Sequence, residues 1–511
     1  MRKWLPLAAV CLGTFMLLVD VTIVVVALPG MAKSLHTSFA DVQWVMDVYA
    51  LALAALLLGA GAVADRLGHR RVYGSGLALF ALASLACALA TGPQALIAFR
   101  AVQGVGGAAM LATTTALIGR IYHGRDRGVA FGVWGAVSGA ASAAGPILGG
   151  VLTEHLDWRW IFFVNLPISV LAIVMTLRFV PVLPGARSRG VDLPGTAAFT
   201  VAAGGVTYAM IKGGDYGWSS APTLGLFAAS GVALAVFVAV ERRREHPLVD
   251  LALFRRGAFS GLMAVAVLLS VAAFSYLAYV SLWLQSVKGM GPVAAGAACV
   301  PMSAAAFVVA SLAGRFLQGV APRWTIGSGM LLIGAGALLQ ATVGSGSDWT
   351  VLVPGMTVTG LGVGLATPVL ASTAMACVAP ERAGMASGAV NTARQLGNAL
   401  GIALLGVVFH AGLADALHGP AVPDPAAAAD ALAGGQAATV LAAAGAAGRQ
   451  LAQEAFATGL RETFLVSGTL GLLGGLVALL FVRPFTAPAP VAAARPAARE
   501  AVAPGTGAAA R

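Results

Sequence analysis

The chain has 511 residues, of which 59% are hydrophobic and only 10% carry a charge, with a formal net charge of +11. A soluble globular protein uses roughly 25% charged residues, so this composition excludes that class and indicates a polytopic membrane protein. The basic residues are spread over separate loops and do not cluster on one face, which argues against nucleic acid as a partner.

Apolar runs of about 20 residues recur between Leu5 and Phe481, separated by short polar breaks. A helix of that length crosses the roughly 30 Å of hydrocarbon in a bilayer. About fourteen such runs can be counted, and they predict an all-α integral membrane protein with both termini on one side. Most of the 31 Lys and Arg fall on loops that this topology places beside the N-terminus, so the positive-inside rule predicts that both termini are cytoplasmic.

The first two runs each contain a carboxylate. Asp20 lies well inside the first run, and Asp47 lies about one turn inside the second run, which opens at Trp44. Acids within a membrane span face the bundle interior and mark ion or proton paths. For Asp47 a second interpretation remains open, in which it sits among the lipid headgroups as the polar start of a helix.

The fourth run contains Arg100, about two turns from its outer start. A guanidinium at that depth requires an acceptor inside the bundle. The alternative is a side chain that snorkels outward to the interface and stabilises the bundle.

A short polar loop joins the second and third runs. Its glycines allow close approach of neighbouring helices, and its carboxylate can accept hydrogen bonds from a helix N-terminus or pair with an arginine. Such a group can latch and release as the halves of a transporter move. The predicted latch residues are Gly61, Asp65, Arg66, Gly68, Arg70 and Arg71.

The fifth run carries small residues at helical spacing around one proline. Such a face lets helices pack closely, and on physical grounds alone it predicts a hinge or a tight contact. The residues concerned are Gly145, Pro146, Gly149 and Gly150.

These strings resemble the motifs of the major facilitator superfamily. The loop from Gly61 to Arg71 is similar to the signature between the second and third helices of the family, with His69 in place of the usual Arg or Lys. The Arg100 string resembles the fourth-helix motif, which implies a role in proton relay. Gly145 to Gly150 resembles the motif of antiporter members. The segments 20–29 and 157–167 resemble the fourteen-helix drug and proton antiporter branch, although Val25 replaces the expected Asn.

The resemblance implies two six-helix bundles related as parallel repeats, with two helices inserted between them. The expected units are an N-terminal bundle over 1–183, linker helices and a loop over 184–256, and a C-terminal bundle over 257–483. A long, partly helical outer loop is expected over 411–461. The alanine- and proline-rich tail over 484–511 is expected to be a disordered cytoplasmic segment.

The second half offers candidates for substrate binding. Tyr276, Tyr279 and Trp283 share one helical stripe, and aromatic faces attract organic cations. Packing between helices and an interface belt explains that stripe equally well. In the thirteenth run, Asn391, Arg394 and Gln395 belong to a polar stripe, which predicts a wall facing a cavity or other helices.

The predicted function is proton-coupled antiport that exports drugs or amphipathic small molecules, with Asp20, Asp47 and Arg100 coupling the proton. The alternative is export of one endogenous anionic or neutral metabolite or antibiotic, with Arg394 as counter-ion. A membrane sensor without transport is a remote alternative. No nucleotide-binding loop, metal site, cofactor motif or catalytic constellation is recognised, so neither ATP nor enzymatic activity is expected. The expected partners are a small molecule, protons and the lipid bilayer, and the expected state is a monomer.

Overall fold

The computed structural model describes residues 2–37, 39–182, 192–244, 247–255, 257–317, 319–417 and 437–482, and also residues 425, 428, 429 and 432. In that part of the chain, 11 helical segments are long and apolar enough to cross a membrane. Three more segments, α8, α13 with α14, and α15, complete the predicted fourteen. They are shorter, interrupted or less apolar than the others, but they lie among the spanning helices.

Proline and glycine set several of the helix boundaries, because proline fits the first turn and glycine allows the turns between helices. Pro93, Pro292 and Pro322 begin α4, α13 and α15, and Gly68 has a φ of 97° in the tight turn between α2 and α3. In chain order the α-helices are α1 (Leu5–Ser34), α2 (Phe39–Leu67), α3 (His69–Ala88), α4 (Pro93–Ile121), α5 (Gly124–His155), α6 (Trp160–Phe163), α7 (Asn165–Phe179), α8 (Leu193–Tyr216), α9 (Ala221–Glu241), α10 (Leu251–Phe254), α11 (Gly257–Ala273), α12 (Leu277–Ser286), α13 (Pro292–Ala298), α14 (Val300–Phe316), α15 (Pro322–Gln340), α16 (Leu352–Ala376), α17 (Ala383–Leu417) and α19 (Ala437–Phe481).

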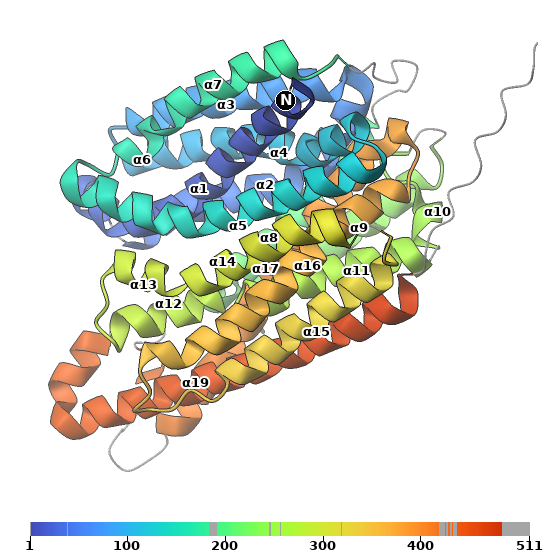
Figure 1. Cartoon of the computed structure of the whole chain (residues 1–511). Helices are drawn as coiled ribbons and strands as arrows, with labels where there is room; N and C mark the ends of the chain where they lie inside the picture. The colour runs from blue at the N-terminus through green and yellow to red at the C-terminus, as the bar shows by residue number, and fades with distance from the viewer. Residues whose placement is uncertain are drawn as a thin grey trace, which may run out of the picture.

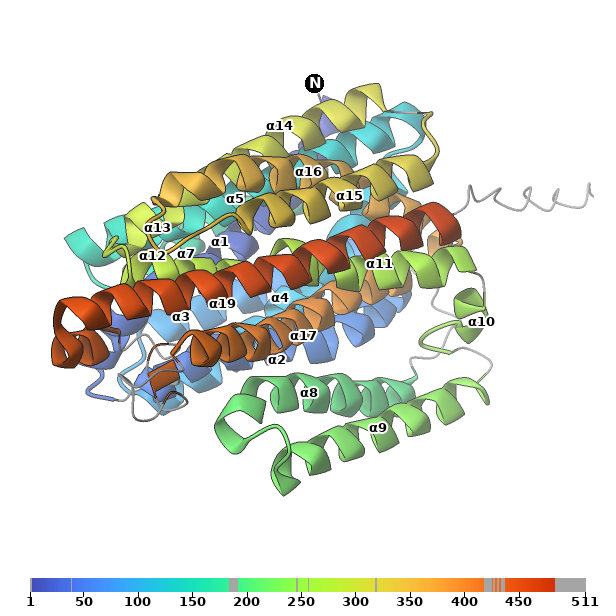
Figure 2. The same cartoon turned by 90° about the horizontal axis from the view of Figure 1, so that it is seen from below.

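The helices form two groups that lie side by side (Figure 1). Helices α1 to α7 make up one group and α11 to α19 the other. The two groups meet where α2 packs on α17 and α5 packs on α14. Helices α8 and α9 pack on each other at the outside, where α8 also contacts α2 and α17 (Figure 2). Helices α8 and α9, the two helices inserted between the bundles in the sequence, therefore do not lie between the two groups in space.

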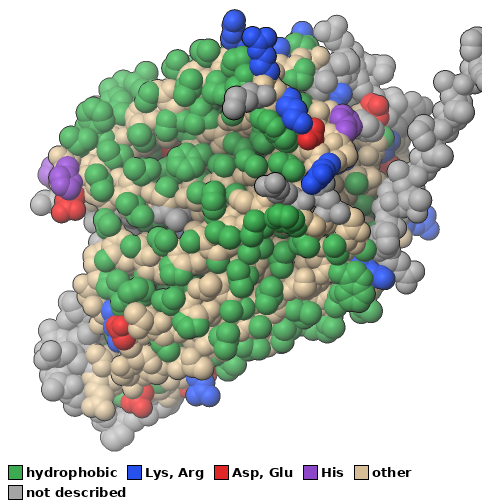
Figure 3. All heavy atoms as spheres, viewed as in Figure 1, with side chains coloured by type: hydrophobic (Ala, Val, Ile, Leu, Met, Phe, Trp, Pro, Cys, Tyr) green, Lys and Arg blue, Asp and Glu red, His purple; other side chains and the backbone are tan. Residues whose placement is uncertain are grey.

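Charged side chains are concentrated at the ends of the bundle, and apolar side chains cover the flank between them (Figure 3). The end where α1 begins also holds the turn between α2 and α3 and the turn between α4 and α5, which carry Arg66, Arg71, Arg120 and Arg125. We call it the basic end. An apolar belt between two polar ends is the surface that a bilayer requires.

Two crossings of small residues hold the groups together toward the basic end. In the α5–α14 crossing, a Cβ on Gly132 would lie 2.7 Å from the carbonyl oxygen of Ala310, and one on Gly314 would lie 2.6 Å from that of Gly128. In the α2–α17 crossing, Gly61 and Gly384 face each other so closely that neither has room for a Cβ. Backbones can approach in this way only where side chains are absent.

The expected outer loop over 411–461 contains long helical stretches. Helix α17 continues to Leu417 and α19 already begins at Ala437, so both helices extend into the predicted loop 411–461. Alanine is the strongest helix former, which explains the extension. Residues 418–424, the first linker residues 184–191 and the predicted tail 484–511 lie outside the described residues.

Candidate proton-coupling and substrate sites

Asp20 lies at the centre of a buried polar cluster between α1, α3, α4 and α7. Its side chain is fully buried. Arg100 donates from Nη1 to Asp20 Oδ2 over 2.7 Å, and the amides of Asn165 and Gln103 donate to Oδ1 over 2.7 and 3.1 Å. A buried ion pair is stable only when further hydrogen bonds satisfy both partners, and this one meets that condition.

Arg100 is held by partners in addition to Asp20. Its Nε donates to the carbonyl oxygen of Val45 over 2.9 Å, and its guanidinium lies 4.2 Å from the centre of the Tyr49 ring. Only 1% of Arg100 is exposed, so the snorkelling alternative is wrong. The arginine faces inward, as the depth of its position on α4 requires.

Three members of the cluster, Gln103, Asn165 and Ser84, are not among the site residues predicted from the sequence. Asn165, the first residue of α7, bonds both Asp20 and the hydroxyl of Ser84, and Ser84 in turn donates to the carbonyl oxygen of Phe162. The signal was present, because Asn165 is an amide within the apolar string 160–168. A polar residue at that depth requires partners, but the sequence does not indicate which.

We expect Asn165→Ala to destabilise the fold, because it removes one buried hydrogen bond from Asp20 and one from Ser84. The cost of such a loss is about 1 to 3 kcal/mol. Thermal unfolding of the purified protein in detergent measures it. The matched control is Gln285→Ala, since the amide of Gln285 is exposed and bonds only Ser281 in its own helix. Equal melting temperatures for the two variants would contradict the structural role of Asn165.

Asp47 lies on α2, two residues after Val45, whose carbonyl oxygen accepts from Arg100. It is half-buried on α2, and the described hydrogen bonds to the Asp20 carboxylate all come from α4 and α7. The sequence placed Asp20, Asp47 and Arg100 in one functional set. The structure brings Asp20 and Arg100 of that set into direct contact.

Asp65 connects the two groups of helices at the basic end. Its Oδ1 and Oδ2 accept from the backbone N–H groups of Gly384 and Met385 over 2.8 and 2.9 Å. These N–H groups belong to the first turn of α17, where an α-helix has no acceptors of its own and favours a negative charge. Asp65 on α2 therefore caps a helix that begins about 320 residues later in the chain.

The other residues of the predicted latch have separate roles. Arg70 donates to the carbonyl oxygen of Leu177, while Arg66 and Arg71 are exposed. His69 is fully buried, so it is a core residue of the latch and not a weakened member of a basic surface cluster. Its Nδ1 lies 3.1 Å from Arg120 Nη1, and because a guanidinium can only donate, the ring proton is assigned to Nε2, which lies 3.2 Å from Asp65 Oδ1 but outside hydrogen-bonding geometry.

The small residues of α5 face two helices. Gly145 is so close to Thr22 of α1 that a Cβ would overlap the threonine hydroxyl, whereas Pro146 and Gly150 face Gly296 and Val293 of α13. Gly149 is buried in the same stretch. This part of α5 therefore packs tightly on α1 in the first group and on α13 in the second group.

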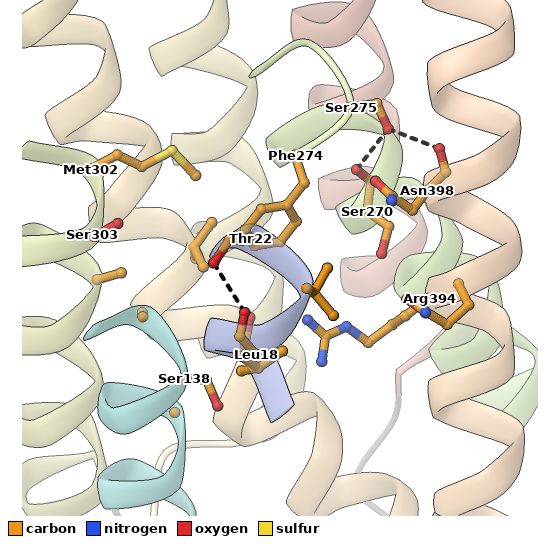
Figure 4. A pocket seen from close by; sticks show the side chains of 18 of the residues that line it. Leu18, Thr22, Ser138, Ser270, Phe274, Ser275, Met302, Ser303, Arg394 and Asn398 are labelled. Carbon is orange, nitrogen blue, oxygen red and sulfur yellow. Dashed lines mark hydrogen bonds between the residues drawn. The ribbon is translucent and has the colours of Figure 1, made fainter. Parts of the chain in front are cut away.

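A cavity of about 430 Å³ lies between the two groups (Figure 4). Its wall comes from α1, α2 and α5 on one side and from α11, α14, α16 and α17 on the other. Arg394 and Gln395 line it together with Asn398. Asn391 lies beside a much smaller hollow that also touches Arg394, and it donates to the carbonyl oxygen of Leu111 across the two groups.

The aromatic stripe of the second half lies elsewhere. Tyr276 and Trp283 are buried among helices, with Tyr276 accepting from Gln340 and packing on Phe464, and Tyr279 donates to the carbonyl oxygen of Ile402. None of the three aromatic residues is in the described wall of the cavity. Their surroundings favour the packing interpretation over a cation-binding one, because the chain turns at Phe274 and redirects the stripe into the second group.

Comparisons with known proteins agree with this architecture. The family model described as Major Facilitator Superfamily matches residues 10–402. Multidrug resistance protein Stp of Mycobacterium tuberculosis is 36% identical over 425 residues, covering 82% of this chain and 79% of that protein. The tetracenomycin C resistance and export protein of Streptomyces glaucescens is 36% identical over 427 residues, covering 81% and 77%. The puromycin resistance protein pur8 of Streptomyces alboniger is 36% identical over 416 residues, covering 80% and 82%.

Two solved structures share the fold. The human organic anion transporter MFSD10 superposes with a TM-score of 0.63 at 16% identity, over 93% of this chain and 99% of that one. The proton:xylose symporter XylE superposes with a TM-score of 0.61 at 12% identity, over 94% and 96%.

Proposed function

The chain belongs to the Major Facilitator Superfamily, and we propose that it exports drugs or other amphipathic small molecules across the bacterial plasma membrane in exchange for protons. The family and its relatives indicate a multi-pass transporter and not an enzyme. The relatives are named for resistance to, or export of, chemically unrelated compounds, which supports efflux as the direction of transport.

The observation that carries the coupling mechanism is the position of Asp20 on α1. Successive residues of an α-helix are turned by about 100°, so Leu18 and Thr22 each lie about 200° around the helix from Asp20. Leu18 and Thr22 line the cavity, while Asp20 faces Arg100 on the opposite side. One helix therefore connects the charged cluster to the substrate space.

Protonation of Asp20 would remove the negative partner of Arg100. The guanidinium would keep Val45, Gln103 and the Tyr49 ring as partners, so it need not leave the cluster. Loss of the ion pair loosens the contact between α1 and α4. Helix α1 can then move, and its cavity-facing residues Leu18 and Thr22 move with it. A substrate that binds best when α1 is in the position with the ion pair would favour deprotonation of Asp20, because linked equilibria are reciprocal.

The energy available is sufficient for active export. A proton that crosses a potential of about 100 mV contributes roughly 2.3 kcal/mol, and a pH difference of one unit contributes about 1.4 kcal/mol. Together they can sustain a gradient of several hundred-fold for a neutral substrate.

We further propose that both termini are cytoplasmic and that residues 1–183 and 257–483 rock against each other in a monomer. The basic residues at the end where α1 begins support that orientation. The Asp65 cap and the two glycine crossings would then hold the cytoplasmic side shut in this conformation. We keep Asp47 as a second proton-binding candidate, at a separate point on α2.

Transport by the reconstituted full-length protein tests the proposal. In proteoliposomes with an imposed proton gradient, we expect a panel of drugs to include compounds that move against their own gradient, and we expect an ionophore that collapses the proton gradient to stop them. Equal transport with and without the gradient would contradict proton coupling. Catalysed transport of a single endogenous metabolite, with no drug competing, would favour the dedicated exporter.

A further inference from the structure

The cavity between the two groups has an unusual charge distribution. Among the described residues that line it, Arg394 is the only one with a formal charge, and none is Asp or Glu. The remaining wall combines apolar side chains such as Leu18, Phe274 and Met302 with uncharged polar groups such as Ser138. The cavity therefore offers one positive charge in an otherwise neutral and largely apolar surface.

Arg394 has no counter-ion within the described part of the protein. Arg100, the other arginine at this depth, is bonded to Asp20, Gln103 and Val45. For Arg394, by contrast, no acceptor is found among the described residues, and its Nε is buried without a hydrogen-bond partner. Arginine cannot lose its proton in a protein, so the guanidinium remains a charge that lacks compensation.

Arg394 lies where a molecule in the cavity can reach it. It lies 11 residues after the first residue of α17, which is about 16 Å along the helix and near the middle of the membrane. Figure 4 shows its side chain reaching from α17 toward Leu18 on α1, across the space between the two groups. A ligand that contacts the guanidinium would therefore also touch the helix that carries Asp20.

We propose that the preferred substrates are organic acids, that is, amphipathic molecules with a carboxylate or a similar anionic group that pairs with Arg394. Their apolar part would pack on Leu18, Phe274 and Met302, and a carboxylate can accept two parallel N–H bonds from one guanidinium. The volume of about 430 Å³ lies within the range of small-molecule sites. This assignment rests on the proposed function, for which it specifies the charge of the cargo.

The charge of the substrate determines how strongly the membrane potential drives the exchange. An anion that leaves the cell moves down the membrane potential, and a proton that enters does so too. The exchange of one monoanion for one proton thus moves two charges, whereas exchange of a neutral molecule moves one. Uptake into inside-positive vesicles should therefore depend more steeply on the potential for an acid than for its neutral analogue.

The test compares nalidixate with its carboxamide, which differ only in the anionic group, and adds ethidium as an organic cation. In proteoliposomes containing the full chain, we expect the KM for nalidixate to be at least tenfold lower than that for the carboxamide. Arg394→Gln should raise the KM for nalidixate at least tenfold and leave that for the carboxamide unchanged, and Arg394→Lys should restore part of the preference. Arg323→Gln, at the start of α15 and away from the cavity, is the matched control.

Three results would overturn the assignment, and they are distinguishable. Equal losses for nalidixate and the carboxamide in a well-folded Arg394→Gln variant would make Arg394 a structural residue. Gradient-driven transport of ethidium without competition by nalidixate would exclude an acid site but leave proton-coupled export intact. The absence of gradient-driven transport for all three probes would refute the proposed function together with the assignment.

Discussion

Asp20→Asn is expected to abolish substrate accumulation driven by a proton gradient. The asparagine keeps the size of the side chain and can still accept a hydrogen bond from Asn165 or Gln103, so the cluster retains its packing. It cannot bind and release a proton, however, and the ion pair with Arg100 is lost permanently. Accumulation should fall from as much as several hundred-fold to no accumulation, while downhill exchange of substrate should persist.

Gradient-driven uptake and substrate exchange in proteoliposomes measure the two activities separately. Asp126→Asn is the matched control, because Asp126 also forms an ion pair, over 3.1 Å with Lys3, but both partners are exposed. Exposed pairs contribute little to stability, so this variant should behave as the wild type. Active accumulation by Asp20→Asn at the wild-type level would rule out Asp20 as the coupling carboxylate.

Gly384→Val is expected to prevent the α2–α17 crossing and with it the closed state of the basic end. A side chain at this position would meet the backbone of Gly61 and would also lie against the Asp65 carboxylate that caps α17. Such overlap with backbone cannot be relieved by a change of rotamer, so the helices must separate. We expect transport to fall at least tenfold, since alternating access needs both closed states.

Labelling from the two sides of the membrane checks this result. A cysteine introduced at Ser303, which lines the cavity, should react faster with an impermeant maleimide from the basic end in the Gly384→Val background than in the parent. Gly74→Val is the control, because Gly74 has open space around it in α3. Unchanged labelling and transport in Gly384→Val would show that the crossing is not a gate.

The fold could be predicted from the sequence because bilayer thickness fixes the length of each span. Charged residues within a membrane span also stand out individually in a sequence, so Asp20 and Arg100 can be predicted as site residues without knowledge of their contact. Their partners were not, because helices pack through contacts between residues far apart in the sequence. Asn165 lies 145 residues from Asp20, and no periodicity relates the two.

Periodicity alone could not decide between the two interpretations of the aromatic stripe, cation binding and helix packing. Tyr276 and Trp283 share one face of an ideal helix, but the chain leaves the helix at residues 274–276, between α11 and α12, and both side chains turn into the second group. His69 illustrates a similar limit. The sequence shows only that it replaces the usual Arg or Lys of the motif, whereas the structure buries it completely beside Asp65 and Arg120.

Proton release on substrate binding tests the central claim most directly. The purified protein in weakly buffered detergent solution, with a pH-indicating dye, is mixed with a compound that it transports. We predict that the wild type releases protons when the compound binds, and that Asp20→Asn releases none while still binding the compound. Equal proton release by the wild type and Asp20→Asn would contradict exchange of proton for substrate at this carboxylate.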